Sequence, residues 1–318
     1  MPDSPTPASS APASSAPDAP APEPGADDAT LRPDGAASPH LAAPQRRQAA
    51  QHAALRPLVI HEIIRAEGET ELARTAGALA LSGLAAGLSM GFSFLTEALL
   101  RAGLPAGPSR RLIASFGYSI GFIIVVLGRQ QLFTESTLTA ILPVLTRRDR
   151  ATAFAVARLW VIVLVANLAG TWCFAALLLP HGVFTKPVVA SLAVLGRDAI
   201  PPGFGATVLK SMFAGWLIAL MVWILPSARS ARLLTVLLVT YVVALARLSH
   251  VVAGSAEAAY AVLTGARPFA DYLGSFLAPT LIGNVFGGVA LVALLNHGTI
   301  ATEIRDSEHR LSDQADDT

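Results

Sequence analysis

Two stretches of the chain decide its fold: residues 127–145, LGRQQLFTESTLTAILPVL, and residues 246–260, ARLSHVVAGSAEAAY. Each lies inside a long apolar run and interrupts that run with charged and polar side chains. At membrane depth such groups cost about 2.5–3.5 kcal/mol each on insertion scales, so they are functional candidates by default. Non-helical backbone is tolerated there only where protein or a water-filled cavity covers it. Both stretches therefore predict a membrane span that is broken in its middle.

The composition around these stretches predicts an all-α membrane protein. Hydrophobic residues make up 53% of the chain and charged residues only 14%, whereas a soluble domain carries about 25% charged residues. Several apolar runs reach the length, about 20 helical residues, that crosses a bilayer. We expect six transmembrane helices, with helices 2 and 5 broken: Gly77–Leu100, one from about Arg111 through the first interruption, Phe154–Leu179, one from about Val208 to Leu225, one from about Leu233 through the second interruption to Leu263, and Tyr272–Leu295.

The two interrupted spans occupy corresponding places in the two halves of this arrangement. In each half the broken span is followed by a span with an Asn-x-x-Gly motif, which begins at Asn167 and at Asn284. Thr134 lies 33 residues before Asn167, and His250 lies 34 residues before Asn284. With three spans in each half, the halves must have inverted topology. Paired interrupted helices of this kind point to a translocation site near the midplane of the membrane.

The chain is expected to divide into four segments. Residues 1–55 form an Ala- and Pro-rich tail that cannot bury enough apolar surface to fold, so we expect it to be disordered. Residues 56–75 predict an amphipathic N-terminal helix on the membrane surface, residues 76–300 the six-span channel domain, and residues 301–318 a polar C-terminal tail. The short loops after the second and fourth spans carry arginines, which favours cytoplasmic termini; these arginines are Arg147, Arg148, Arg150, Arg229 and Arg232.

Several classes of protein are disfavoured by the residues present. A single cysteine, Cys173, excludes an intramolecular disulfide and a cysteine-based metal site. No basic stripe interleaved with aromatic residues suggests nucleic acid as a partner. The segment from His61 begins like a zinc-protease HExxH motif, but its fifth residue is Arg65. We therefore expect no catalytic residue, no metal and no cofactor, and a membrane enzyme is disfavoured.

The residues of the broken spans and of the spans that follow them resemble the formate/nitrite transporter family, over roughly residues 58–300. The resemblance rests on Leu132, Phe133 and Thr134, the Asn167/Gly170 pair, His250, and the segment Pro279–Gly288, PTLIGNVFGG. It implies an aquaporin-like fold with an inverted repeat, assembled as a homopentamer in a bacterial inner (plasma) membrane. Each protomer of such proteins has its own pore for small monovalent anions such as formate, nitrite or hydrosulfide.

The resemblance also assigns roles to individual residues. The central polar pair of the pore would be Thr134 and His250. The apolar constrictions of the pore would be formed by Tyr118, Phe122, Phe133 and Val243. The broken loops would be hydrogen-bonded by Asn167 and Asn284.

Several residues depart from the pattern of that family. Gln131 stands where an Asp usually precedes Leu-Phe-Thr, Arg129 and Gln130 replace small residues, and Gly254 replaces an Asn four residues after the histidine. The charges additional to the pattern are Arg129, Glu135, Arg247 and Glu257. An unpaired charge at that depth would be prohibitive. We therefore expect the charges of one break to pair with those of the other as structural clamps, with a pore-lining role as the alternative.

The sequence thus predicts a transmembrane channel or transporter for small monovalent weak-acid anions, linked to protons through the central His250. Histidine titrates near neutrality, and an anion sheds its water at a lower cost once it is protonated. Simpler alternatives are His250 bonded to a backbone carbonyl, Thr134 bonded to the carbonyl four residues earlier, and Tyr118 and Phe122 as a packed pair. The expected partners are the lipid bilayer and the anion. A non-conducting sensor or scaffold that keeps the fold, or a transporter of a different small solute, remains the alternative function.

Overall fold

The computed structural model describes residues 42–45, 47, 54–201, 203–290, 298 and 300. The chain divides into Met1–Ala54 and Leu55–Thr318, and every element discussed below lies in the second of these units. The expected tails at 1–55 and 301–318 lie almost wholly outside the described residues, as does the end of the expected sixth span at 291–295.

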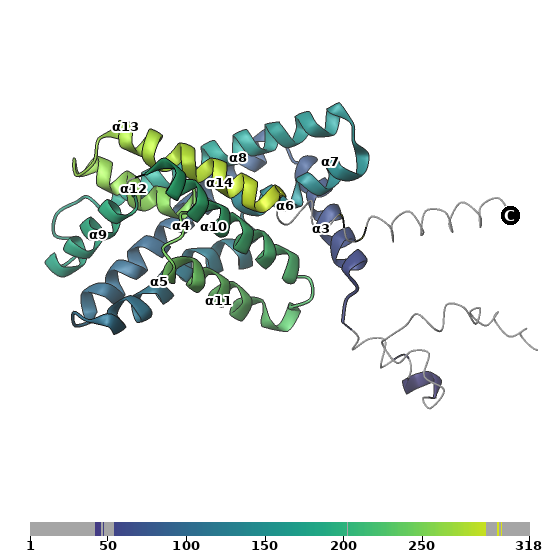
Figure 1. Cartoon of the computed structure of the whole chain (residues 1–318), viewed down its shortest axis with the longest axis horizontal. Coiled ribbons are helices and arrows are strands. Elements are labelled where there is room, and N and C mark those ends of the chain that lie inside the picture. The colour runs from purple at the N-terminus through teal and green to yellow at the C-terminus, as the bar shows by residue number, and fades with distance from the viewer. Residues whose placement is uncertain are drawn as a thin grey trace, which may run out of the picture. The chain divides into compact units, whose positions relative to one another are not determined.

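All regular elements of the described residues are helices, which confirms the predicted all-α class (Figure 1). The α-helices are α3 (Pro57–Leu72), α4 (Ala76–Gly103), α5 (Pro108–Leu127), α6 (Phe133–Thr139), α7 (Ile141–Arg147), α8 (Arg150–Leu177), α9 (Lys186–Asp198), α10 (Phe204–Ile224), α11 (Arg232–Leu245), α12 (Ala253–Leu263), α13 (Phe269–Asp271) and α14 (Ala278–Gly288). A short 3₁₀ helix, η1 (Arg229–Ala231), precedes α11, and a π-helical segment, η2 (Tyr272–Leu277), precedes α14.

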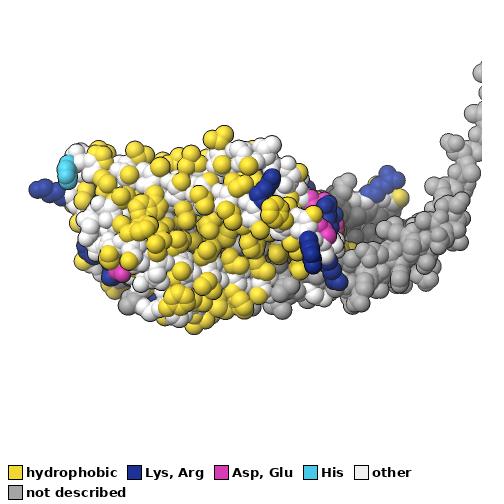
Figure 2. All heavy atoms as spheres, turned by 90° about the horizontal axis from the view of Figure 1, so that it is seen from above, with side chains coloured by type: hydrophobic (Ala, Val, Ile, Leu, Met, Phe, Trp, Pro, Cys, Tyr) yellow, Lys and Arg dark blue, Asp and Glu magenta, His cyan; other side chains and the backbone are white. Residues whose placement is uncertain are grey.

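Four of the described helices, α4, α5, α8 and α10, are long and apolar enough to cross a membrane. The expected fifth span is divided between α11 and α12, of 14 and 11 residues, and each is shorter than the 18 residues such a helix needs. Apolar side chains on the outer sides of the long helices are exposed, among them Leu81 and Phe154. Figure 2 shows hydrophobic side chains over the middle of one face, with most of the charged side chains toward its ends. A lipid environment accounts for so large an exposed apolar surface.

The helices pack in two similar groups. In the first, α4 packs against α5 and α8, and in the second, α10 packs against α11 and α14; α5 and α11 join the groups. The α4–α8 contact depends on Gly87 and Gly170, because a Cβ on Gly87 would overlap the carbonyl of Asn167. Gly215 and Gly287 make the same close contact between α10 and α14. Small residues that let helix backbones approach are typical of membrane bundles.

One helix was not expected from the sequence. The segment Lys186–Asp198 lies between the third and fourth expected spans, and it forms α9, which packs against α4 and α12. It begins with a proline at its first turn and buries Leu192 and Leu195 in an apolar cluster with residues of α4, α8 and α12. Its 13 residues are too short for a span, so the segment lacks the hydropathy signal that marks the other helices. The helix matters because its last residue, Asp198, reaches the candidate site.

Candidate pore site

The two breaks have the same backbone geometry. Arg129 follows the end of α5 and Arg247 follows the end of α11, and their φ angles are 51° and 50°. In both places the residue after the arginine donates its N–H to the carbonyl five residues earlier, which closes the helix with a left-handed residue. An L-residue in this conformation costs about 1–2 kcal/mol. The chain thus leaves each helix by the same strained turn and starts a new helix, α6 or α12, a few residues later.

Asn167 of α8 holds the first break. Its Oδ1 accepts a hydrogen bond from the N–H of Phe133 at 2.9 Å. Its Nδ2 donates to the carbonyl of Gln131 at 3.0 Å and to the carbonyl of Gly83 on α4 at 2.7 Å. Asn167 is fully buried, so this one amide satisfies two backbone groups that the broken helix leaves without helical partners and ties them to α4.

Asn284 of α14 holds the second break in the same way. Its Oδ1 accepts from the N–H of Val251 at 2.8 Å, and its Nδ2 donates to the carbonyls of Ser249 at 3.1 Å and Ser211 at 2.8 Å. Gln131 of the first half therefore corresponds to Ser249 of the second. The contacts of Asn284 therefore match those of Asn167 hydrogen bond for hydrogen bond.

The contacts also correct the register that the sequence spacing gave to this repeat. The spacing matched Thr134 with His250. The hydrogen bonds instead match Leu132 with His250, because each accepts through its carbonyl the N–H four residues later, and they match Thr134 with Val252. Thr134 and His250 come from non-equivalent positions, so the site where they meet is asymmetric.

Thr134 and His250 nevertheless meet directly. The Thr134 Oγ1 lies 2.8 Å from the His250 Nε2, and both residues are about 1% exposed. The backbone N–H of Ala253 donates to His250 Nδ1 at 3.1 Å. Because Nδ1 accepts, the proton of the neutral ring is on Nε2, which donates to Thr134. The Thr134 hydroxyl proton is therefore left for another acceptor. Neither simpler alternative for these two side chains, a bond to a backbone carbonyl, is what the structure shows.

Apolar side chains enclose this pair. The rings of Phe122 and His250 are 5.0 Å apart between centroids in an edge-to-face arrangement, and the rings of Tyr118 and Phe122 are 5.4 Å apart. Phe133 and Val243, the other residues expected at the constrictions, are buried in the same apolar cluster. Tyr118 and Phe122 thus pack together, as the simpler alternative to a constriction has it, and the ring of Phe122 also contacts the histidine.

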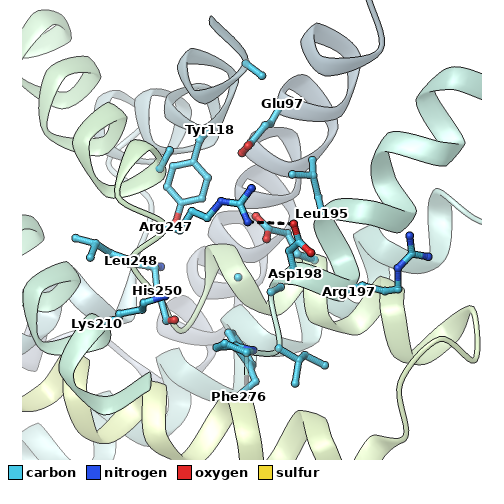
Figure 3. A pocket seen from close by; sticks show the side chains of 18 of the residues that line it. Glu97, Tyr118, Leu195, Arg197, Asp198, Lys210, Arg247, Leu248, His250 and Phe276 are labelled. Atoms are coloured by element: carbon cyan, nitrogen blue, oxygen red, sulfur yellow. Dashed lines mark hydrogen bonds and ion pairs between the residues drawn. The ribbon is translucent and has the colours of Figure 1, made fainter. Parts of the chain in front are cut away.

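Two cavities open near the pair. The first, which we call the His250 cavity, has a volume of about 320 Å³ and is lined by His250, Tyr118 and Glu257, among others (Figure 3). The second, the Glu135 cavity, has a volume of about 900 Å³, and Glu135 is among the residues that line it. Phe122 lines neither cavity.

The charges of the two breaks do not meet, which corrects the expected clamp between Arg129, Glu135, Arg247 and Glu257. Arg129 and Glu135 line the Glu135 cavity, whereas Arg247 and Glu257 line the His250 cavity. Arg129 pairs with Glu67 of α3 at 3.0 Å, and Arg247 pairs with Asp198 of α9 at 3.1 Å, as Figure 3 shows for the second pair. Each strained turn directs its arginine toward its own cavity, and another helix supplies the acid there.

Two departures from the family pattern have structural explanations. The Gln131 side chain accepts from Arg74 Nη1 at 2.7 Å and donates to Ser136 Oγ at 3.3 Å, so it connects the first break to the segment after α3. Gly254 leaves room for a ring, since a Cβ there would lie 2.9 Å from the side chain of Phe276. Phe276 lines the His250 cavity, and its ring occupies the space that a side chain on residue 254 would fill.

Sequence reasoning missed several residues that line the cavities. Glu71 of α3 accepts a hydrogen bond from Thr139 Oγ1 at 2.6 Å, and its burial raises the pKa of its carboxyl group. Asp198 was missed together with α9. Glu97 lines the His250 cavity, and a lone glutamate inside the apolar run of the first span was the signal for it. Glu71 and Asp198 lie in segments that carry no comparable signal.

Comparisons with known proteins agree with this geometry. Residues 58–298 match the family model described as formate/nitrite transporter. The chain is 38% identical over 253 residues to "Inner membrane protein YfdC" of Escherichia coli (strain K12), which is 78% of this chain and 80% of that protein. It is 25% identical over 224 residues to "Uncharacterized transporter YrhG" of Bacillus subtilis (strain 168), or 68% of this chain and 83% of that protein.

Two solved structures share the fold. One, described as an "FNT family ion channel", aligns with a TM-score of 0.64 at 20% identity, over 74% of this chain and 96% of its own. Another, described as "Pentameric formate channel with formate bound", aligns with a TM-score of 0.59 at 20% identity, over 69% of this chain and 95% of its own. The predicted resemblance and the prediction of a transporter rather than an enzyme are confirmed. On the family model and the identity to its curated relative, the chain belongs to the formate/nitrite transporter family.

Proposed function

We propose that the chain is a channel or transporter for small monovalent anions of weak acids, such as formate and nitrite. Family membership supports the class of protein, and a solved structure of the same fold is described as a formate channel with formate bound. Within this chain the proposal rests on one observation above all, the buried contact of Thr134 with His250. A polar pair enclosed by aromatic rings is what an anion needs where it must leave water.

The proposal includes a topology. Six spans cross the membrane, the second formed by α5 with α6 and α7 and the fifth by α11 with α12. The matching hydrogen bonds of Asn167 and Asn284 support the two breaks as equivalent features of inverted halves. Cytoplasmic termini follow from the arginine-rich loops. A homopentamer in a bacterial inner membrane is supported by the descriptions of a structural neighbour and of a relative.

In this proposal Thr134 is the group that contacts the permeant. His250 donates its Nε2 proton to Thr134, so the threonine hydroxyl can donate its own proton to an oxygen of the permeant. Uptake is linked to protons, and His250 contributes by fixing the direction of the threonine hydroxyl that binds the permeant. The ring keeps its neutral form as long as Nδ1 accepts from Ala253.

The proposal is tested by uptake of formate, nitrite and hydrosulfide into proteoliposomes that contain the purified chain, at two outside pH values. We expect uptake of at least one of these anions, and a faster rate of uptake at the lower outside pH. His250→Ala should lower the rate, because Thr134 loses its donor. A chain that gives no uptake of any anion would be a sensor or scaffold, and an unchanged rate in His250→Ala would refute the role of the histidine.

A further inference from the structure

The Glu135 cavity contains polar atoms that have no partner within the chain. Among the described residues, five buried side-chain nitrogen or oxygen atoms lack a hydrogen-bond partner, and three of these belong to residues that line this cavity. The three atoms are Gln130 Oε1, Glu135 Oε1 and Arg232 Nε. Buried polar groups in proteins are almost always hydrogen-bonded, so each atom that is not needs a reason. We take their gathering around one cavity as a sign of a binding site.

The three atoms need a ligand that both donates and accepts hydrogen bonds. Glu135 Oε1 and Gln130 Oε1 are acceptors, while Arg232 Nε is a donor. Glu135 and Arg232 are close enough to interact electrostatically, yet neither of these atoms has a hydrogen-bond partner among the described residues. A small oxygen acid fits between a carboxylate and a guanidinium, because its O–H can face the carboxylate and its other oxygen can accept from the guanidinium.

We propose that the Glu135 cavity is a proton-exchange site for a small oxygen acid, where Glu135 gives the proton to the anion and takes it back. In the loading direction the O–H bond of the protonated Glu135 carboxyl breaks and an O–H bond forms on an oxygen of the bound anion. Glu135 is left as a carboxylate and the permeant as a neutral acid. Glu135 then regains a proton from water on its side of the membrane. The inference rests on the proposed function, since the permeant must be a weak-acid anion.

The pore needs such a site before its constriction. The rings of Phe122 and Phe133 are buried in one apolar cluster and line neither cavity, and a bare charge is costly among apolar side chains. His250 is poorly placed to supply the proton, because its Nδ1 already accepts from Ala253 and loss of its only ring proton would leave an imidazolate. We therefore assign the proton to a carboxyl group in a cavity, and hydrogen bonding to the central pair.

Other charged side chains line the cavity around Glu135. They come from α3 and the segment after it, from the first break, and from the start of α11 and the 3₁₀ helix before it: Glu67, Glu71, Arg74, Arg129, Arg229 and Arg232. The four arginines outnumber the three carboxyl groups, which favours an anion in the cavity. Glu71, whose pKa is raised by burial, adds a second carboxyl group that can be protonated close to Glu135.

The test follows formate uptake into proteoliposomes together with the pH inside them, reported by an enclosed dye. Glu135→Gln keeps an amide oxygen in place but cannot exchange a proton. We expect it to lower uptake by at least about tenfold and to flatten the dependence of the remaining rate on the pH at the side of this cavity. The matched control is Glu62→Gln, because Glu62 is half exposed on α3 and does not line the cavity. It should behave as the unaltered chain.

A second variant keeps the inference falsifiable if Glu135→Gln does not assemble. Arg232→Gln removes the proposed anion partner and should raise the formate concentration for half-maximal uptake about tenfold, while the pH dependence stays. If neither variant changes rate, half-maximal concentration or pH profile, the inference is wrong and the proposed function stands. If the unaltered chain takes up no anion, the proposed function itself fails, and the inference fails with it.

Discussion

The two asparagines that hold the breaks should be among the most sensitive positions of the chain. Asn167→Ala would leave two buried backbone groups of the first break without partners, the N–H of Phe133 and the carbonyl of Gln131, and would remove a second hydrogen bond from the carbonyl of Gly83, which keeps its partner within α4. A buried group left unsatisfied costs about 1–3 kcal/mol. Two of them should therefore cost at least about 2 kcal/mol in free energy of unfolding. For a chain of this size that is a fall of roughly 4–8 °C in unfolding temperature.

The same loss is expected at Asn284→Ala, because Asn284 makes the same two contacts with the second break and a third with Ser211 of α10. The measurement is thermal unfolding of the purified protein in detergent, followed by circular dichroism. Thr235→Ala is a suitable control, since its hydroxyl bonds the carbonyl of Ala231 on an exposed helix surface and such changes usually stay within about 0.5 kcal/mol. If the unfolding temperatures of both asparagine variants lay within 2 °C (roughly 0.5 kcal/mol) of the unaltered chain, the asparagines would not be what holds the breaks.

Three further predictions concern the backbone and the charges near the site. Gly87→Ala should reduce the yield of folded protein, because its Cβ overlaps the carbonyl of Asn167. Gly77→Ala on the same helix is the control, because its Cβ meets no other atom and the yield should stay the same. Equal yields of the two variants on size exclusion would contradict the packing. Arg247→Gly should leave stability unchanged or raise it. Glycine relieves the left-handed conformation, which costs an L-residue about 1–2 kcal/mol, and this gain offsets the loss of an exposed ion pair worth about 0.2–1 kcal/mol. A clear fall in unfolding temperature would argue that the arginine has a further structural partner. Burial raises the pKa of Glu71, so the folded chain holds a proton that the unfolded chain has released, and stability should fall as pH rises from the ordinary glutamate range through the raised pKa. Glu71→Gln should remove that slope and be the more stable protein at neutral pH, and an unchanged slope would count against the burial effect.

The sequence predicted the long helices because each is a continuous apolar run with clear ends. The first expected span, Gly77–Leu100, differs from α4 by only a few residues at its end. Two interruptions were also expected, because charged residues inside an apolar run have no other inexpensive arrangement, and α5 ends at Leu127 and α11 at Leu245. The roles of Asn167 and Asn284 came from a family resemblance, and the structure adds the atoms that they contact.

The parts that could not be predicted depend on contacts between distant segments. Arg129 finds its partner Glu67 on a helix outside the spans, and Arg247 finds Asp198 on α9. No periodicity in the sequence links those residues. The register of the repeat was missed for a related reason: Asn167 and Asn284 contact backbone groups, so the side chains at matching positions, Leu132 and His250, need not resemble each other.

The central claim is that the Thr134 hydroxyl, directed by His250, donates a hydrogen bond to the permeant at the centre of the pore. The most direct measurement compares formate uptake by Thr134→Val and Thr134→Ser in proteoliposomes, with assembly of both checked by size exclusion. Valine has the same shape without the hydroxyl, and an oxygen of the permeant left without a partner, about 1–3 kcal/mol, should slow uptake about fivefold to a hundredfold. Serine keeps the hydroxyl and should retain most of the rate. Uptake by Thr134→Val at the rate of the unaltered protein would contradict the claim.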